Sequence, residues 1–125
     1  MYCLDASFLI DLSRGDKKAL EKLNELKGTR LYVSAVASYE FLYGVNQSSR
    51  REQEAAQMIA ALDVLGFGRI EAMEAAELKR KTEEKGETVG QLDLLTAAIT
   101  KTNHLRLVTR DKDFRKIPGL EVEEY

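Results

Sequence analysis

The sequence predicts an α/β protein whose parallel sheet is covered by helices on both faces. Short apolar runs alternate with longer segments of helical periodicity along the 125 residues. A parallel strand is buried on both faces, so it reads as an uninterrupted apolar run, and parallel neighbours need crossover connections that are usually helical. A chain of 14.1 kDa has room for one hydrophobic core, so we expect a single domain over residues 1–125.

In the first half of the chain, glycines and polar residues mark where helices begin and end. A buried strand is expected at 2–4, with a short helix over 7–12 directly after it. Asp16 is typical of a helix N-cap and Gly28 of a helix end, which predicts a second helix between them. The elements expected next are a strand at 31–33, a helix from Ser34 to about Gln47, and an amphipathic helix that carries Ala55, Met58, Ile59 and Leu62.

The second half of the chain predicts one long surface helix and one buried helix. Residues 71–85 carry an alanine-rich face, whereas residues 92–102 are apolar nearly all round. The stretch from Gly66 to Ile70 is expected to be a turn with a short strand. Further strands are expected at 105–109 and 120–122, with one helical turn at 113–116 between them.

Charge and composition exclude several classes of protein. Nineteen basic and twenty-one acidic residues give a net charge of -2, which rules out nucleic-acid binding by bulk charge but allows a local basic rim. No apolar run approaches the eighteen residues of a membrane span, and the first residues lack the pattern of a signal peptide. The lone Cys3 cannot form an internal disulfide. We therefore expect a cytoplasmic protein in a reducing environment.

Five acidic residues stand among apolar neighbours rather than on a charged face. They are Asp5, Glu40, Asp93, Asp111 and Asp113. In an open α/β sheet, ligands bind beyond the carboxyl ends of the strands, where the strand order reverses. Asp5 and Asp111 each follow an expected strand, so at least these two should meet at one edge of the sheet.

Each acid also has a simpler interpretation. Asp5 and Asp111 are suited to cap the helices that they precede, and Asp93 is suited to the positive end of its own helix. Glu40 lies inside a predicted helix and has no capping role, which leaves an exposed position on a mixed face as its alternative.

If the acids converge, they need a cation. Two carboxylates 4 Å apart repel by about 4 kcal/mol at an effective dielectric constant near 20. Oxygen ligands without His or Cys among them suit Mg²⁺ or Mn²⁺ better than zinc. Such ions commonly bind substrate phosphate, so the residues point to phosphate chemistry.

Four segments together resemble the PIN-domain nucleases, and among these the VapC toxins of prokaryotic toxin–antitoxin pairs. The resemblance covers nearly the whole chain, because the four segments occur in the family's order and at its spacing. The segments are Asp5-Ala6-Ser7, Glu40 with Gly44 after it, Asp93-Leu94-Leu95-Thr96-Ala97-Ala98, and Thr109-Arg110-Asp111-Lys112-Asp113-Phe114.

This resemblance implies a three-layer α/β/α PIN-like fold and an Mg²⁺-dependent endoribonuclease, with Mn²⁺ as a substitute ion. The implied catalytic residues and metal ligands are Asp5, Glu40, Asp93 and Asp111, with Asp113 as a further ligand and Ser7 and Thr109 as supporting residues. The implied partners are an RNA substrate, a VapB-like antitoxin and a second copy of the chain. Ala6 stands where Thr is usual, and Arg110 where Asn is frequent, so the fine geometry of the site is expected to differ.

Two further surfaces are expected near the acids. Basic residues at Arg110, Lys112 and Arg115 are candidates to hold the RNA backbone, and a solvated charged turn is the alternative. Leu12, Tyr39 and Tyr43 are candidates for an antitoxin groove, with the core or a homodimer contact as the alternative.

Three other kinds of protein are alternatives to a nuclease. The closest is a non-catalytic PIN-like module that binds RNA or protein, although such a module gains nothing from clustered like charges. Ser–His–Asp chemistry would need His104, the only histidine, which lies in an expected helix-to-strand connection. An acidic pair at the first strand, as receiver-type domains require, is absent from Asp5-Ala6-Ser7.

Overall fold

A five-stranded parallel sheet forms the centre of the protein. The computed structural model describes residues 1–45 and 49–125, so the expected helix end at Gln47 lies outside the described residues. The strand order is β3-β2-β1-β4-β5, and every neighbouring pair is parallel. The strands are β1 (Tyr2–Leu4), β2 (Leu31–Ser34), β3 (Asp63–Leu65), β4 (Arg106–Val108) and β5 (Val122–Glu123).

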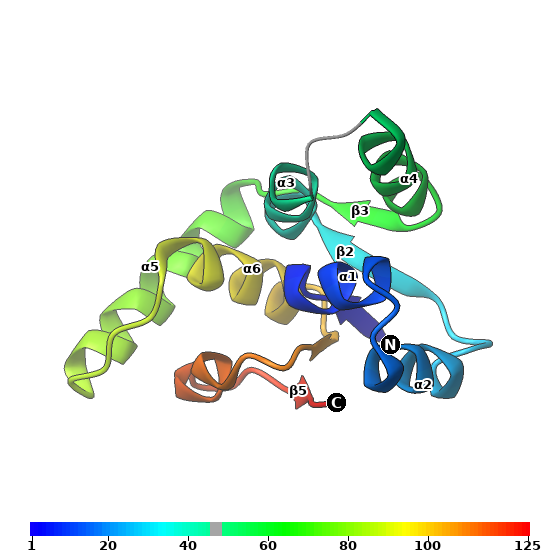
Figure 1. Ribbon diagram of the computed structural model, residues 1–125. Helices are drawn as coiled ribbons and strands as arrows, with labels where there is room; N and C mark the ends of the chain where they lie inside the picture. Colours follow the sequence, from blue (N-terminus) through cyan, green and yellow to red (C-terminus); the bar gives the residue numbers. More distant parts are fainter. Residues whose placement is uncertain (46–48) are drawn as a thin grey trace.

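Helices cover both faces of this sheet, which gives three layers (Figure 1). The helices are α1 (Ala6–Ser13), α2 (Lys17–Glu25), α3 (Ala35–Gly44), α4 (Ser49–Ala60), α5 (Arg69–Glu84), α6 (Gln91–Thr102) and the 3₁₀ helix η1 (Lys112–Lys116). Alternating side chains of one strand point to opposite layers. Leu4 of β1 packs with α1 to α4, whereas its neighbour Cys3 packs with α5, α6 and η1. The expected α/β/α architecture is confirmed.

Local chemistry explains where the first helices begin. The carboxylate of Asp16 accepts a hydrogen bond from the Ala19 N–H at 3.0 Å, which caps α2 as expected. Ser34 caps α3 in the same way, because its hydroxyl accepts from the Ala37 N–H at 2.9 Å. Gly15 ends α1 with a φ of 72°, a conformation that favours glycine.

The third strand does not lie where the sequence predicts it. It occupies Asp63–Leu65, just before the expected stretch from Gly66 to Ile70, and α5 already begins at Arg69. β3 is an edge strand that pairs only with β2, and Val64 is 48% exposed. An edge strand with exposed side chains needs no continuous apolar run, which is why its signal is weak. No helix of the described residues is long and apolar enough to cross a membrane.

The chain changes direction across the sheet between β1 and β4. From β1 it builds outward through β2 and β3, and it then returns to add β4 and β5 on the other side of β1. Cys3 therefore lies between Tyr32 of β2 and Leu107 of β4. The crevice beyond the carboxyl ends of β1 and β4 is the place where ligands bind in such sheets.

Candidate active site

Asp5 lies at this crevice, directly after β1. Its backbone N–H donates to the Val108 carbonyl at 3.0 Å, which ties the end of β1 to the end of β4. One carboxylate oxygen, Oδ2, accepts hydrogen bonds from the hydroxyls of Ser7 and Thr109, both at 2.8 Å. Asp5 precedes α1 but makes no side-chain capping bond to it. The hydroxyl bonds from Ser7 and Thr109 direct this oxygen toward the segment after β4.

Burial dominates the electrostatics of Asp5. The residue is only 5% exposed, and this burial raises its pKa, although the bonds from Thr109 and Ser7 act in the opposite direction. A buried carboxylate is retained only where donors satisfy it. The hydroxyls of Ser7 and Thr109 are the donors to one oxygen of the Asp5 carboxylate, Oδ2.

Thr109 also connects Asp5 to the segment that follows β4. Its hydroxyl oxygen accepts from the Asp111 N–H at 3.0 Å, while the Asp111 carboxylate accepts from the Asp113 N–H at 2.9 Å. Asp111 thus caps η1, as the simpler interpretation predicts, and still lies beside the acid at the end of β1. Asp113 is exposed and pairs with Lys116 at 3.1 Å.

Glu40 and Asp93 approach the crevice from the two helical layers. Glu40 lies on α3, and Asp93 lies in the first turn of α6. These helices are joined where the Ser34 hydroxyl, at the start of α3, meets the Thr96 hydroxyl at 3.3 Å. Neither acid is fully exposed.

The charges of neighbouring acids act on Glu40 and on Asp93. Burial, followed by the charges of Asp5 and Asp93, raises the pKa of Glu40 to about 7. Burial, followed by the charges of Asp5, Asp111 and Asp113, raises the pKa of Asp93 to about 6. Asp5 thus acts on both Glu40 and Asp93, and Asp93 also feels the charges of Asp111 and Asp113. We call these five acids the acid cluster.

The acid cluster fits a hard divalent cation by its chemistry. Every member offers carboxylate oxygens, and their mutual repulsion is the condition that a cation relieves. In the part of the chain that the structure describes, no three acidic, histidine or cysteine side chains are arranged to hold a metal ion. Mg²⁺ usually keeps several of its waters and needs only one or two carboxylates from the protein, so a cage of three is not required to hold it.

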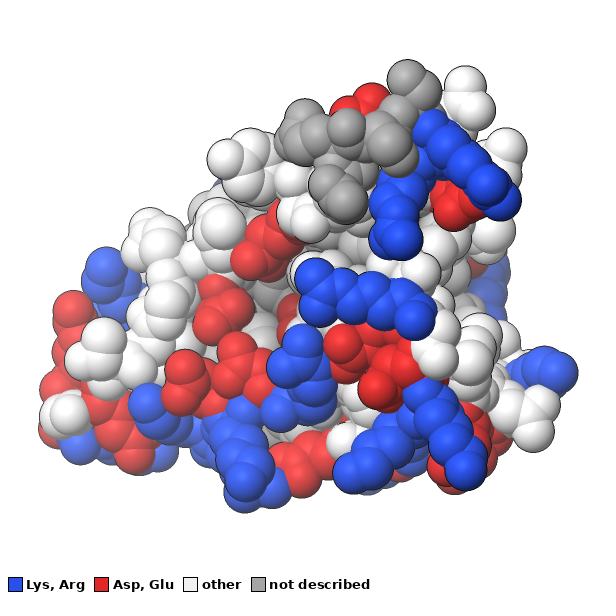
Figure 2. Space-filling view, viewed as in Figure 1, with Lys and Arg blue, Asp and Glu red and all other residues white. Residues whose placement is uncertain are grey.

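Two of the three predicted RNA-binding residues are engaged in ion pairs. Nε of Arg110 donates to Asp11 at 2.6 Å, and the guanidinium of Arg115 pairs with Glu124. Lys112 is exposed. Figure 2 shows acidic side chains in the middle of one face with basic side chains beside them, which is the local basic rim that the net charge allows.

Sequence reasoning missed two residues beside the site. Asp11 on α1 is buried, and its Oδ2 accepts from Arg110 Nε and from the Tyr125 hydroxyl, both at 2.6 Å. The hydrogen bonds from Tyr125 and Arg110 outweigh burial and lower the pKa of Asp11. The signal that could have found Asp11 is its place between Ile10 and Leu12, an acid among apolar residues.

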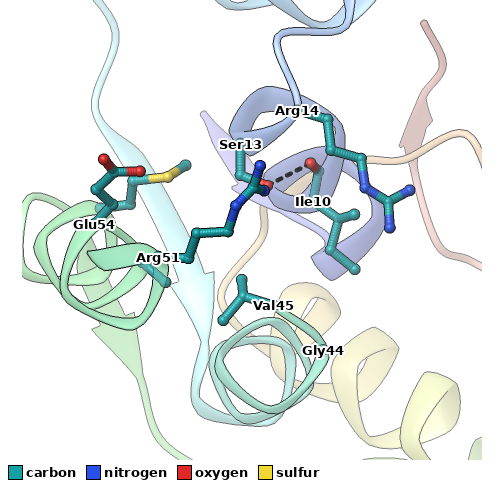
Figure 3. A pocket seen from close by; sticks show the side chains of 9 residues that line it. Ile10, Ser13, Arg14, Gly44, Val45, Arg51 and Glu54 are labelled. Atoms are coloured by element: carbon teal, nitrogen blue, oxygen red, sulfur yellow. Dashed lines mark hydrogen bonds between the residues drawn. The ribbon is translucent and has the colours of Figure 1, made fainter. Parts of the chain in front are cut away.

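A cavity beside α1 does not contain the acid cluster (Figure 3). It measures about 440 Å³ and lies where the ends of α1 and α3 meet α4. In Figure 3, Arg51 reaches from α4 toward Ser13 on α1. The lining residues are Ile10, Ser13, Arg14, Gly44, Val45, Arg51, Glu54, Ala55 and Met58.

The expected groove residues lie outside this cavity. Tyr39 and Tyr43 are 58% and 74% exposed, and their rings stack with centroids 6.2 Å apart. Leu12 is partly buried against the core between the sheet and α1 to α4. His104 lies before the amino end of β4, the opposite edge of the sheet from Asp5, which leaves no Ser–His–Asp arrangement at the crevice.

Comparison with known proteins defines the class to which this fold and site belong. The PIN domain family model matches residues 2–120, and the chain therefore belongs to the PIN domain family. It is 31% identical over 127 residues to Ribonuclease VapC1 of Rickettsia felis, covering 95% of this chain and 92% of the relative. It is also 24% identical to the tRNA(fMet)-specific endonuclease VapC of Salmonella typhimurium, over 99% and 97% of the two chains.

Solved structures give the same result. The chain superposes with a TM-score of 0.87 on a chain of the VapBC2 structure from Rickettsia felis, bound to a DNA fragment from its promoter. The two share 25% sequence identity, and the match covers 99% of this chain and 98% of the other. The resemblance to PIN-domain proteins and the predicted fold are thereby confirmed.

Proposed function

We propose that the protein is an Mg²⁺-dependent endoribonuclease, the toxin of a toxin–antitoxin pair, and that the chain acts as one nuclease domain. The observation that carries this proposal is the acid cluster at the switch point of a PIN-family sheet. Relatives that cover nearly the whole chain are named VapC ribonucleases, which supports RNA as the substrate. PIN-domain nucleases in general use a divalent metal, and the carboxylate donors here suit Mg²⁺, with Mn²⁺ as a substitute.

The members of the acid cluster have different proposed roles. Asp5, Glu40, Asp93 and Asp111 are the proposed catalytic residues and metal ligands, with Asp113 as a further ligand. Ser7 and Thr109 hold Asp5 in place through the hydrogen bonds that their hydroxyls donate to its carboxylate.

The proposed reaction needs no nucleophile from the protein. A bound divalent cation supplies activation of water for in-line attack on the phosphodiester and stabilisation of charge on the leaving oxygen. The carboxylates place the reacting groups and keep the crevice negative until the cation arrives. Exposed Lys112 and the exposed parts of Arg110 and Arg115 line up the RNA backbone beside them. The products are a 5′-phosphate and a 3′-hydroxyl.

The proposed partners follow the same reasoning. Solved relatives are VapBC complexes, which supports a VapB-like antitoxin as the partner of this chain. Exposed apolar side chains on α3 and at the start of α5, among them Tyr43, Ile70 and Met73, are the proposed contacts with the antitoxin or with a second copy in a homodimer. We place this activity in the cytoplasm.

Incubation of the purified protein with structured RNAs, an initiator tRNA among them, tests the function. We expect cleavage with Mg²⁺ or Mn²⁺, none in excess EDTA, and 5′-phosphate ends that phosphatase treatment removes. The Asp93→Asn variant should be inactive under every condition. Full activity in EDTA, or products that end in a 2′,3′-cyclic phosphate, would contradict the mechanism. Binding of RNA with no cleavage in any metal would instead favour the non-catalytic module.

A further inference from the structure

Helix α1 contacts the segment after β4 at two places, and only the first lies in the acid cluster. Ser7 and Asp11 are four residues apart on α1, so their side chains lie on one face of the helix. The first contact joins Asp5 and Ser7 to Thr109. The second joins Asp11 Oδ2 to Nε of Arg110 at 2.6 Å. Two successive residues after β4 are thus fixed to one helix.

Tyr125 completes the second contact. Its hydroxyl donates to the same oxygen of Asp11 at 2.6 Å, and its ring packs edge-on against Phe8 with centroids 4.9 Å apart. The side chain of Asp11 is only 12% exposed, whereas that of Arg110 is 54% exposed. A carboxylate that is this buried needs such donors. We call Asp11, Arg110 and Tyr125 the Asp11 clamp.

The clamp holds Arg110, which lies in the chain between Thr109 and Asp111. Arg110 follows Thr109, which donates to Asp5, and precedes Asp111, whose N–H donates to the Thr109 hydroxyl. Neighbouring Cα atoms are 3.8 Å apart across a planar peptide, so fixing Arg110 restricts the residues on either side.

We propose that the Asp11 clamp is a positioning device for the acid cluster, and that Asp11 and Tyr125 are positioning residues for its reaction. By holding Arg110 against α1, the clamp keeps the Thr109 hydroxyl and the Asp111 carboxylate aligned with Asp5. The inference rests on the proposed nuclease function, because the positioned acids are its proposed catalytic residues. Arg110 acts in this view mainly as an anchor for the turn.

Two variants and a matched control test the clamp. Asp11→Asn weakens both hydrogen bonds, whereas Tyr125→Phe removes one and keeps the ring against Phe8. The control is Asp63→Asn, because Nε of Arg30 meets Asp63 Oδ2 at the same 2.6 Å, but at the amino ends of the strands and with both side chains largely exposed.

We expect Asp11→Asn to lower kcat for a short RNA about tenfold and Tyr125→Phe to lower it about threefold, with KM changed by less than about twofold. Both variants should also show a smaller rise in melting temperature on addition of Mg²⁺ than the wild type. Asp63→Asn should match the wild type in kcat and in the Mg²⁺ effect. If Asp11→Asn does not fold, Tyr125→Phe decides the matter.

Three outcomes would overturn the clamp. A raised KM with unchanged kcat would mean that Arg110 acts by contacting RNA. A lowered melting temperature with unchanged kcat and an unchanged Mg²⁺ effect would mean that Asp11 serves stability alone. If the wild type cleaves no RNA, the proposed function fails, and the Mg²⁺ effect, which needs no RNA, still tests the clamp. Equal Mg²⁺ effects in wild type and Asp11→Asn would then reject it.

Discussion

At the scale of single residues, Glu40 and Asp93 bind protons more tightly in the folded protein than in the unfolded chain. Their pKa values rise from 4.5 to about 7 and from 3.8 to about 6, chiefly through burial and then through neighbouring carboxylates. A raised pKa gives stability that is complete below the unfolded pKa and is lost as the pH rises through the folded one. The metal-free protein should therefore lose stability between about pH 4 and pH 7 from these two groups.

The Asp93→Asn variant tests this repulsion without relying on activity. In EDTA at pH 8 we expect its melting temperature to exceed that of the wild type by about 4 °C, which corresponds to roughly 1 kcal/mol of relieved repulsion. Between pH 5.5 and pH 8 the wild type should lose more stability than the variant. Mg²⁺ should raise the melting temperature of the wild type at pH 8 and that of the variant much less.

Thermal unfolding at both pH values, with EDTA and with Mg²⁺, supplies the measurement. Groups with lowered pKa, such as Asp11 and Glu77, lose their stabilising contribution only at more acidic pH, so they do not obscure this window. Identical pH profiles for wild type and Asp93→Asn, together with no Mg²⁺ effect on either, would show that Asp93 is an ordinary helix-terminal acid.

At the scale of helices and strands, local signals set the helix boundaries. The N-cap of α2 is the simplest to test, because Asp16 is exposed and bonds to Ala19 within its own helix. Asp16→Ala should cost about 1 kcal/mol of stability and leave RNA cleavage unchanged. Urea unfolding checks the free energy, with Lys18→Ala, an exposed substitution on the same helix, as the control. Equal stability of the two variants would mean that the cap contributes nothing.

The strands show what local signals miss. β1, β2 and β4 are predictable because each carries adjacent buried residues that are mostly apolar, although β4 begins with the exposed Arg106 and β2 ends with Ser34. β3 is missed because it lies at an edge, and the turn after it, Gly66-Phe67-Gly68, offers the more visible pattern.

The site shows the same division between local and distant information. The acids at strand ends follow from the fold class, and the hydroxyls of Ser7 and Thr109 follow from the family resemblance. The partners of Asp11 do not, because Arg110 is 99 residues away along the chain and Tyr125 is 114. Which of several exposed arginines meets which buried acid depends on tertiary packing, and no local pattern encodes it.

At the scale of the whole molecule, the exposed tyrosines of α3 mark a surface that a binding partner would cover. Tyr39 and Tyr43 stack on each other and remain open to solvent. Large apolar side chains gathered on a surface are typical of interaction sites. We propose that they contact the antitoxin, and a homodimer contact is the competing interpretation.

Co-expression with the protein encoded next to this one should yield a tight complex, and Tyr43→Asp should abolish it. A charge at a site that is 74% exposed should leave the melting temperature within about 2 °C, since surface substitutions change stability little. Light scattering of the variant alone separates the two interpretations. A broken homodimer that still binds the antitoxin, or an unchanged complex, would show that the groove lies elsewhere.

The strand order also governs when the site comes into existence during synthesis. Residues 1–65 contain β1, β2 and β3, so one half of the sheet can pair while the remainder is still on the ribosome. Asp5 can accept its hydrogen bond from Thr109 only after that residue, 104 positions further along, has been synthesised. Asp111 is synthesised later still. A nascent chain therefore carries Asp5 and Glu40 long before it carries a complete acid cluster. The proposed nuclease thus becomes competent only when almost all of it has left the ribosome, itself built largely of RNA.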